Sequence, residues 1–268
     1  MADHTVYLIT GANRGIGLAI TSLLLTRPNT TVIATSRKPL SLSAVGGANV
    51  HPTSKLVPVL LDEVDPAITS ATLPARLTAE HGITHLDVVI ANAGTSSAFE
   101  GVMSSSASTT GADPGKAMLR DFEVNAVGPA RLFGALWPLL DSHRERADED
   151  REGMRKVKKF VLMSSSLGSI GALEQESLPG VSYGMSKAAA NWWAKKVSVE
   201  LKGRLLVGII HPGWVQTGLG QALASAVGFG EPPTTPEQSA KAVVEQIDNL
   251  TPEKSGQFLK YNGEQLPW

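Results

Sequence analysis

The sequence predicts a doubly wound α/β fold, in which helices cover both faces of a single parallel sheet. Two observations lead to this prediction. Short apolar runs at 6–10, 31–36, 56–61, 86–91, 159–164 and 205–211 are typical of strands buried on both faces. Amphipathic stretches such as 16–25 and 122–139 lie between strands and indicate helices. Strands that alternate with helices form a parallel sheet, whose carboxyl ends share one edge.

The composition indicates one domain that spans residues 1–268. A chain of 268 residues with 42% hydrophobic composition can bury a sizeable core. Its net charge of −1 gives no electrostatic reason to expect a nucleic acid or membrane partner. The absence of cysteine excludes disulfides and thiolate metal sites. We see neither a secretory signal nor an apolar run long enough to cross a bilayer, and therefore expect a cytoplasmic protein.

Two segments differ from the rest of the chain. Residues 96–114 are rich in Ser, Thr, Gly and Ala, which indicates a flexible surface loop. Residues 141–159 mix both charge signs densely, which is typical of the solvated end of a helix and its turn. We assign no function to either segment.

A glycine-rich turn follows the first predicted strand and opens the first helix. Gly11 allows a tight turn, Gly15 allows the backbone to approach a pyrophosphate, and Gly17 allows the helix to pack on the strand. Free N–H groups and the positive end of the helix dipole favour a phosphate there. Such a pattern is weak in isolation, but its place between strand and helix predicts a dinucleotide site.

The end of the second strand indicates which dinucleotide is bound. An NAD enzyme places an acid there for the ribose 2′-hydroxyl, whereas this chain has Ser36, Arg37 and Lys38. Arg37 can clamp a phosphate and Ser36 can donate to it, with Arg14 of the glycine turn nearby. These cations are also ordinary after a surface strand. The missing acid makes NADPH/NADP+ the predicted cofactor.

Tyr183 and Lys187 begin another helical run. Their i,i+4 spacing puts phenol and ammonium on one helix face. A free tyrosine has a pKa of about 10. A nearby ammonium and an oxidised nicotinamide ring would lower the pKa of Tyr183 toward the range useful for acid–base catalysis. By itself this spacing is common and means little.

A run of three serines, Ser164 to Ser166, ends the fifth predicted strand. Any of their hydroxyls could polarise a substrate carbonyl, and each could equally cap the turn. The residues alone leave this choice open.

Together these motifs resemble the short-chain dehydrogenase/reductase family over nearly the full length of the chain. The resemblance rests on residues in the family's order and spacing, namely Thr10, Gly11, Gly15, Gly17, Ala91 to Gly94, Asn125, the serine turn, Tyr183, Lys187 and Pro212 to Thr217. It implies a single Rossmann-type, NADP-binding domain that reduces a ketone to a secondary alcohol by hydride transfer.

The resemblance implies a catalytic tetrad of Asn125, Ser165, Tyr183 and Lys187. Ser165 matches because the family's active serine stands three residues before the turn glycine, here Gly168. Tyr183 would donate the proton, and Asn125 would hold a water that links Lys187 to solvent.

The resemblance also implies a set of cofactor-binding residues. Asp62 would bind the adenine, Asn92 to Gly94 would line the adenosine and ribose, and Val215 with Thr217 would hold the carboxamide. The full set is Gly11, Asn13, Arg14, Gly15, Ile16, Gly17, Ser36, Arg37, Asp62, Asn92, Ala93, Gly94, Tyr183, Lys187, Pro212, Gly213, Val215 and Thr217.

Three stretches, 80–92, 212–217 and 263–268, look like fungal norsolorinic-acid-type ketoreductases and the sniffer and C-factor reductases, and the serine turn looks more like the latter two. Residues 218–233 would form a loop over the substrate. Trp214, Leu219, Leu223, Phe229 and Leu167 would line an apolar pocket. We therefore hypothesise a bulky hydrophobic ketone, such as an aromatic polyketide of fungal secondary metabolism.

Several other residues are given structural roles. We expect no metal site, because Gly82 separates His81 from His85 and no third ligand is near. His211 is interpreted as a turn residue, and Trp192 and Trp193 as core or subunit-interface residues. The resemblance suggests a homodimer or homotetramer.

Two alternatives to ketone reduction stay open. The same tetrad could oxidise an alcohol with NADP+ or serve another biosynthetic reaction. A catalytically silent relative could act by binding alone, although the intact tetrad argues against it.

Overall fold

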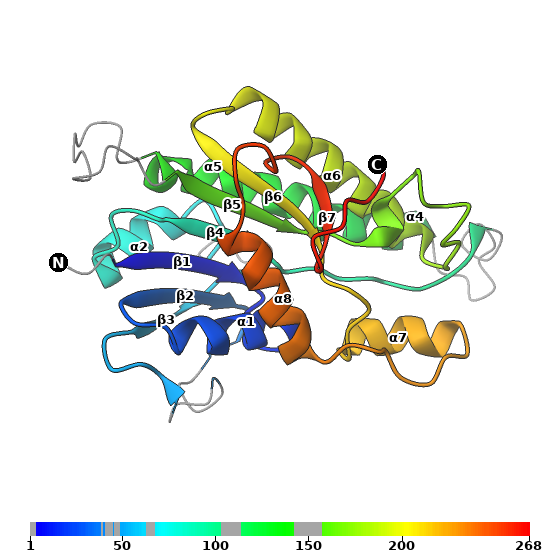
Figure 1. The fold of residues 1–268 in the computed structure, drawn as a ribbon, viewed down its shortest axis with the longest axis horizontal. Coiled ribbons are helices and arrows are strands. Elements are labelled where there is room, and N and C mark those ends of the chain that lie inside the picture. Colours follow the sequence, from blue (N-terminus) through cyan, green and yellow to red (C-terminus); the bar gives the residue numbers. More distant parts are fainter. Residues whose placement is uncertain are drawn as a thin grey trace.

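A computed structural model of the chain describes residues 4–38, 40, 45, 49–62, 68–102, 114–141 and 157–268. Its centre is a seven-stranded sheet in the order β3-β2-β1-β4-β5-β6-β7 (Figure 1). Every neighbouring pair is parallel. The predicted fold class is therefore confirmed. The strands are β1 (Thr5–Thr10), β2 (Thr30–Ser36), β3 (Lys55–Leu60), β4 (Val88–Ala91), β5 (Lys158–Met163), β6 (Leu205–His211) and β7 (Phe258–Lys260).

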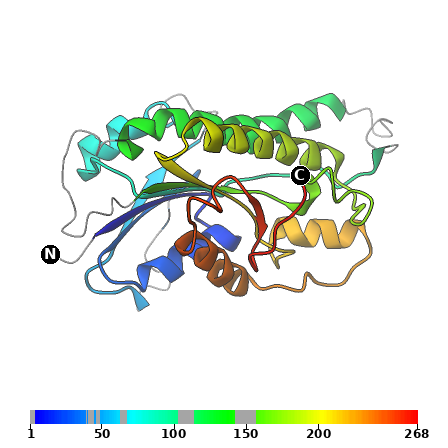
Figure 2. The same cartoon turned by 45° about the horizontal axis from the view of Figure 1, so that its top comes forward.

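Helices pack on both faces of this sheet, and the core has one half on each (Figure 2). Leucine and alanine side chains of α2, α5 and α6 pack on one face, and those of α1 and α8 pack on the other. Within the described ranges, no helix is both long and apolar enough for a bilayer span. The helices are α1 (Gly15–Leu25), α2 (Leu73–His81), α4 (Pro114–Phe122), α5 (Gly128–Leu140), α6 (Val181–Glu200), α7 (Gly218–Ala226) and α8 (Pro236–Asp248).

Two strands differ from the prediction. β3 was expected to be buried on both faces, but its residues alternate between buried and exposed. It is the outermost strand beside β2, and only its Val57 and Val59 are fully buried, in the same half of the core as Leu73 and Leu77 of α2. β7 has only three residues and was not predicted.

The helix predicted over 122–139 is three elements. α4 ends at Phe122, a π-helix follows over Glu123–Val127, and α5 begins at Gly128. A π-helix shifts hydrogen bonds from the fourth to the fifth residue, and such turns are frequent at functional sites. This one carries Asn125, so the break lies in the predicted catalytic region.

The two unusual segments are described in part. Residues 96–101 form a loop, as predicted, and α4 starts at Pro114, while 103–113 lie outside the described residues. α5 ends at Leu140, and the next residue, Asp141, accepts a hydrogen bond of 2.8 Å from Arg204. Residues 142–156 also lie outside the described part.

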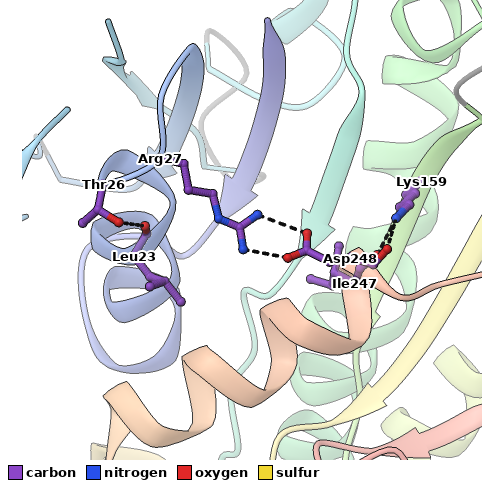
Figure 3. Close-up of polar contacts among 6 residues, drawn as sticks. All are labelled: Leu23, Thr26, Arg27, Lys159, Ile247 and Asp248. Carbon is purple, nitrogen blue, oxygen red and sulfur yellow. Dashed lines mark hydrogen bonds and ion pairs between the residues drawn. The ribbon is translucent and has the colours of Figure 1, made fainter. Parts of the chain in front are cut away.

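Charged side chains tie several elements together at the amino end of the sheet. Both terminal nitrogens of Arg27, just after α1, donate to the Asp248 carboxylate at 3.1 and 2.7 Å (Figure 3). Lys159 Nζ donates to the carbonyls of Ile247 and Asp248 at 2.5 and 3.1 Å (Figure 3). The last turn of α8 is thereby fixed to both α1 and β5.

A buried ion pair lies at the same end of the sheet. Asp87, just before β4, accepts from the Val6 N–H at 2.7 Å and pairs with Lys158 Nζ at 2.5 Å. The side chains of Asp87 and Lys158 are 9% and 13% exposed, so both charges are shielded from water.

Candidate active site

The predicted catalytic residues gather at the carboxyl ends of the central strands. β1 lies between β2 and β4, so the chain direction across the sheet reverses beside it. In open α/β sheets, ligands bind outside the carboxyl ends at such a switch point. The glycine turn follows β1, the serine turn follows β5, and both meet this edge.

Tyr183 and Lys187 lie on one face of α6, as the spacing predicted. Lys187 Nζ is 5.6 Å from the centre of the Tyr183 ring. Both residues are buried, with 7% and 3% of their surfaces exposed. Lys187 Nζ donates to the Met163 carbonyl at 2.8 Å, and no carboxylate among the described residues pairs with it. The ammonium is therefore held by a neutral acceptor.

Burial moves the proton affinities of this pair. It raises the pKa of Tyr183 to about 12, an effect that the Ser165 hydrogen bond reduces and the Asp121 charge reinforces. It lowers the pKa of Lys187 to about 8. The sequence predicted a lowered pKa for Tyr183 beside both the Lys187 ammonium and an oxidised nicotinamide ring; in the protein without cofactor, desolvation of the phenolate dominates and the pKa is raised instead. A raised pKa keeps the phenol protonated, as a proton donor requires.

The three serines have different partners. Ser164 donates to Asn191 Oδ1 at 2.5 Å, and the Ser166 N–H donates to His211 Nδ1 at 3.1 Å. The Ser165 hydroxyl accepts from the Leu167 N–H at 3.3 Å, and it lies near enough to the Tyr183 phenol to lower the pKa of that phenol by hydrogen bonding. The geometry thus favours Ser165 as the active serine, while the capping interpretation holds for the same residue.

Two glycines allow the serine turn to approach α6. A Cβ on Gly168 would lie 2.8 Å from Lys187 Cβ, and one on Gly184 would lie 2.8 Å from the Leu167 carbonyl oxygen. Any side chain at Gly168 or Gly184 would therefore collide with these atoms. The close approach brings Ser165 within reach of Tyr183.

Asn125 is fully buried, and its amide is nearly saturated with hydrogen bonds. Nδ2 donates to the Thr95 carbonyl at 2.7 Å and to Ser186 Oγ at 2.9 Å, while Oδ1 accepts from the Thr95 N–H at 2.9 Å. A Cβ on Gly94 would lie 3.3 Å from Asn125 Oδ1 and 3.5 Å from Lys187 Nζ. Asn125 therefore joins the β4 loop to α6 beside Lys187, and only one lone pair on Oδ1 is left for a water.

The glycine turn has the backbone that the sequence predicted. Gly11 and Gly15 have φ of 66° and 55°, a region that favours glycine. A Cβ on Gly17 would collide with the Gly11 carbonyl oxygen and the Asn92 amide. Arg14 precedes α1 without a side-chain hydrogen bond to it, so the first N–H groups keep no such cap. The turn is open to an anion.

Asn92 and Ala93 hold the glycine turn in place. Asn92 Nδ2 donates to the Thr10 carbonyl at 2.8 Å, and the N–H groups of both residues donate to Thr10 Oγ1 at 3.0 Å. Asn92 thus supports the turn, while its neighbours Ala93 and Gly94 are exposed at the site.

The predicted phosphate clamp follows β2. Arg14 and Arg37 are exposed, and neither takes part in an ion pair within the described ranges. The Ser36 hydroxyl differs from expectation, because it is buried and donates to the Lys38 carbonyl. Ala12 N–H donates to the Thr35 carbonyl at 3.0 Å, which joins the glycine turn to this strand end.

The remaining predicted cofactor residues surround the same edge. Asp62 follows β3 and is half-buried, Asn13 is exposed and Ile16 is half-buried. A Cβ on Gly15 would lie 3.0 Å from Thr217 Cγ2, so the first glycine turn and the segment after β6 meet.

The segment predicted as a loop over 218–233 begins with a helix, α7. Thr217 caps this helix by accepting from the Gly220 N–H at 3.2 Å. After α7 the chain returns to the segment that follows β6. Val215 and Thr234 form an isolated parallel β-bridge there, and the Gln216 N–H donates to the Thr234 carbonyl at 2.8 Å. The Val215 carbonyl accepts from the Thr217 N–H at 2.7 Å. Both this carbonyl and the Thr217 hydroxyl are therefore already hydrogen-bonded within the protein.

The predicted apolar pocket is assembled in part. The rings of Trp214 and Phe229 are 4.9 Å apart, and Phe229 is half exposed. Leu223, in contrast, is only 6% exposed and packs inward. Sequence reasoning missed Phe99, whose ring meets Tyr183 edge to face at 5.9 Å. A Cβ on Gly180 would lie 3.0 Å from both Phe99 and Leu167, so these two apolar side chains flank the site.

The residues given structural roles are placed as follows. His81 ends α2 and Gly82 follows in a left-handed conformation, so His85 shares no helix face with it. No three potential metal ligands cluster in the described part of the chain. Burial lowers the pKa of His211 to about 4. Trp193 packs against Phe133 and Phe160 in the core, whereas Trp192 is 69% exposed.

Comparisons with known proteins identify the family of this chain. Residues 5–228 match the short chain dehydrogenase family. Norsolorinic acid ketoreductase nor1 of Dothistroma septosporum is 36% identical, covering 100% of this chain and 94% of that protein. The NADPH-bound carbonyl reductase from chicken fatty liver superposes with a TM-score of 0.76 at 29% identity, over 99% of both chains. Carbonyl reductase Sniffer of D. melanogaster gives 0.74 at 26%, over 99% and 100%.

The family match covers most of the chain, and the relatives cover its whole length. The parallel sheet, the glycine turn and the Ser165–Tyr183–Lys187 geometry are consistent with it. The chain belongs to the short-chain dehydrogenase family of oxidoreductases.

Proposed function

We propose that this protein reduces a bulky hydrophobic ketone to a secondary alcohol with NADPH. The observation that carries the proposal is the buried trio of Ser165, Tyr183 and Lys187 beside the glycine turn. A phenol with a raised pKa, hydrogen-bonded to a serine and next to an ammonium, is a proton donor placed where the family's substrates react.

The residues present fit a phosphorylated dinucleotide. Gly11, Gly15 and Gly17 leave space that side chains would fill, next to the uncapped start of α1. Arg14 and Arg37 would bind the 2′-phosphate, since both are exposed and no acid stands at the end of β2. Ser36 can accept from a ligand while it donates to Lys38, but it would have to rotate to donate to a phosphate.

Each catalytic residue has a defined task in the proposed reaction. The bound cofactor supplies a hydride to the carbonyl carbon. Tyr183 gives its phenolic proton to the carbonyl oxygen, so the C=O bond becomes CH–OH. Ser165 polarises that oxygen by hydrogen bonding, and Lys187 stabilises the phenolate left on Tyr183. Asn125 keeps the β4 loop against α6, and the free lone pair of its Oδ1 can hold the water that reprotonates the site.

The surroundings of Tyr183 favour a bulky apolar substrate. Phe99 and Leu167 flank it. Trp214, in the segment after β6, forms an apolar ring pair with Phe229. Flat aromatic walls bind flat apolar ligands. The relative named as a norsolorinic acid ketoreductase supports an aromatic polyketide ketone as the substrate class.

The raised pKa of Tyr183 supplies the protonated phenol that ketone reduction needs at neutral pH. Oxidation needs the phenolate as a base, and burial holds the phenol protonated. The same residues still catalyse both directions, so the ratio of NADPH to NADP+ sets the net flux.

The test is to follow NADPH absorbance with α-tetralone, a bicyclic aromatic ketone, and with acetone. We expect a much higher kcat/KM for α-tetralone, and a loss of about 10²–10⁴-fold in Tyr183→Phe. Tyr7→Phe is the matched control, because Tyr7 contacts Arg27 at the opposite end of the sheet. Better turnover of acetone would overturn the substrate class, and full turnover by Tyr183→Phe would overturn the role of Tyr183 as proton donor.

A further inference from the structure

Asp121, on the last turn of α4, is a fully buried carboxylate with neutral partners. Its oxygens accept from the Ser97 N–H at 2.9 and 3.1 Å, from Ser97 Oγ at 2.8 Å and from Ser182 Oγ at 2.6 Å. No lysine, arginine or histidine in the described part of the chain forms an ion pair with it. A buried carboxylate is usually paired with a cation, so this arrangement is unusual.

The hydrogen bonds of Asp121 join two segments that surround Tyr183. Ser182 precedes Tyr183 on the first turn of α6. Ser97 lies two residues before Phe99, whose ring touches Tyr183. The Glu100 carbonyl in the same loop accepts from the Gly180 N–H at 2.9 Å, a second contact with the start of α6. Asp121 is thus the shared acceptor between the loop after β4 and the helix that carries Tyr183.

We propose that Asp121 is a positioning residue for Tyr183, and that its buried negative charge acts together with burial to hold the phenol in its protonated form. The proposal rests on the proposed role of Tyr183 as proton donor. It assigns Asp121 two effects that experiment can separate: an electrostatic one from its charge, and a geometric one from its hydrogen bonds.

The electrostatic effect depends on the groups that face Tyr183. Lys187 faces it from its own helix and favours the phenolate, while Asp121 on α4 opposes it. Ser165 contributes a neutral hydrogen bond from the serine turn, and His211 behind that turn is neutral at neutral pH. The negative charge of Asp121 therefore acts in the same direction as burial and in the opposite direction to the Lys187 ammonium, in a region from which water is excluded.

The geometric effect predicts what happens when the charge is removed. In Asp121→Asn, Oδ1 can still accept from the N–H and the hydroxyl of Ser97, and the Ser182 hydroxyl can rotate to accept from the new amide. The variant therefore keeps the contacts between α4, the loop and α6, while the charge is lost. Asp121→Glu keeps the charge and is its matched control.

The experiment reads the ionisation of Tyr183 directly. The chain has three tyrosines, so the phenolate absorbance of each protein minus that of its Tyr183→Phe counterpart isolates Tyr183. Rapid pH jumps record the signal before alkaline unfolding. We expect Tyr183 to ionise about 1 pH unit lower in Asp121→Asn than in the wild-type protein. Asp121→Glu and Ser182→Ala, which keep a carboxylate, should titrate as the wild-type protein does.

An unchanged titration of Tyr183 in Asp121→Asn would overturn the proposal. If that variant does not fold, Asp121→Ser replaces it, because a small hydroxyl leaves room for water to bridge the two serines. The kcat for α-tetralone should fall in Ser182→Ala with no shift in its pH profile, whereas the alkaline limb of the profile should move down in Asp121→Asn. Activity of Tyr183→Phe tests the proposed function separately, since the titration requires no turnover.

Discussion

The two ends of the parallel sheet hold their charged side chains in different ways. At the amino end, Asp87 is paired with Lys158, and Arg27 with Asp248. At the carboxyl end, Lys187 donates to a carbonyl and Asp121 accepts from serines. The first arrangement neutralises each charge with its opposite. In the second arrangement neither charge is neutralised by an ion pair among the described residues, so each acts on the neighbouring Tyr183.

The ion pairs at the amino end contribute to the stability of the fold, whereas the charges at the carboxyl end contribute to the proposed chemistry. An ion pair fixes two elements, as Figure 3 shows for Arg27 after α1 and Asp248 at the end of α8, and the fields of its two opposite charges largely cancel. A buried charge with a neutral partner destabilises the fold, but its field is directed at Tyr183. We therefore expect substitutions at the amino end to change stability alone, and substitutions at the carboxyl end to change activity first.

The largest effect is expected for Lys187→Met. Loss of the ammonium beside Tyr183 should lower kcat/KM for the reduction of α-tetralone by about 10³-fold, which is about 4 kcal/mol. Folding should become more stable by about 2 kcal/mol, since the desolvation of Lys187 disappears while the Met163 carbonyl loses its donor.

The pH dependence of folding checks the same prediction. The pKa of Lys187 is about 8 when folded and 10.5 in the unfolded chain. Below pH 8 Lys187 is charged in both states, and the folded wild-type protein bears the full desolvation penalty of the ammonium. Between pH 8 and 10.5 the unfolded state holds a proton on Lys187 that the folded state has lost. Stability of the wild-type protein should therefore rise with pH in this window relative to Lys187→Met, as urea unfolding at several pH values measures. Parallel curves would contradict the prediction.

The second effect is a loss of stability at the amino end. Lys158→Met leaves the Asp87 carboxylate buried without its main cation and should lower the free energy of unfolding by about 3 kcal/mol. The kcat of the folded fraction should not change. Adding Asp87→Asn to this variant should restore part of the stability, and a double-mutant cycle measures the coupling. A decrease in kcat without a decrease in stability would reverse the comparison.

The third effect concerns the exposed cations at the carboxyl end. Arg37→Asp should lower kcat/KM for NADPH by about 30-fold, or about 2 kcal/mol, and raise the preference for NADH, because a charge-assisted contact with the 2′-phosphate becomes repulsive. Lys202→Asp, which changes the net charge equally beyond the end of α6, is the control. An unchanged preference for NADPH would remove Arg37 from the cofactor site.

The smallest effect is expected at the apolar wall. Phe229→Ala should raise the KM for α-tetralone about 5-fold, near 1 kcal/mol, and leave kcat unchanged, because the exposed ring binds ground state and transition state equally. Val227→Ala, near the end of α7, is the matched control. A fall in kcat would show instead that Phe229 acts on the reacting atoms.

The sequence was informative where a function depends on local spacing. Six of the strands, the glycine turn and the shared face of Tyr183 and Lys187 follow from short-range patterns. β7 was missed because a strand of three residues has too little periodicity to be detected. The π-helix at Asn125 was missed because its side chains continue the apolar pattern of a regular helix.

Contacts between distant segments had no signal in the sequence. Asp121 meets Ser97 and Ser182 only after folding, across 24 and 61 residues of chain. Phe99 lies in a segment whose small polar residues indicated only a loop. The burial that raises the pKa of Tyr183 depends on how α6 packs, so a motif of five residues could not predict its direction.

The π-helix makes the segment between α4 and α5 sensitive to its length. Each residue of an α-helix turns the chain by about 100°. Removing one residue from Glu123–Val127, so that the α-helix runs through without interruption, would rotate everything before it relative to α5. Asn125 could then not stay in phase with both Ser186 and the core residues of α5. Substitutions are therefore easier to accommodate in this segment than a deletion of even one residue.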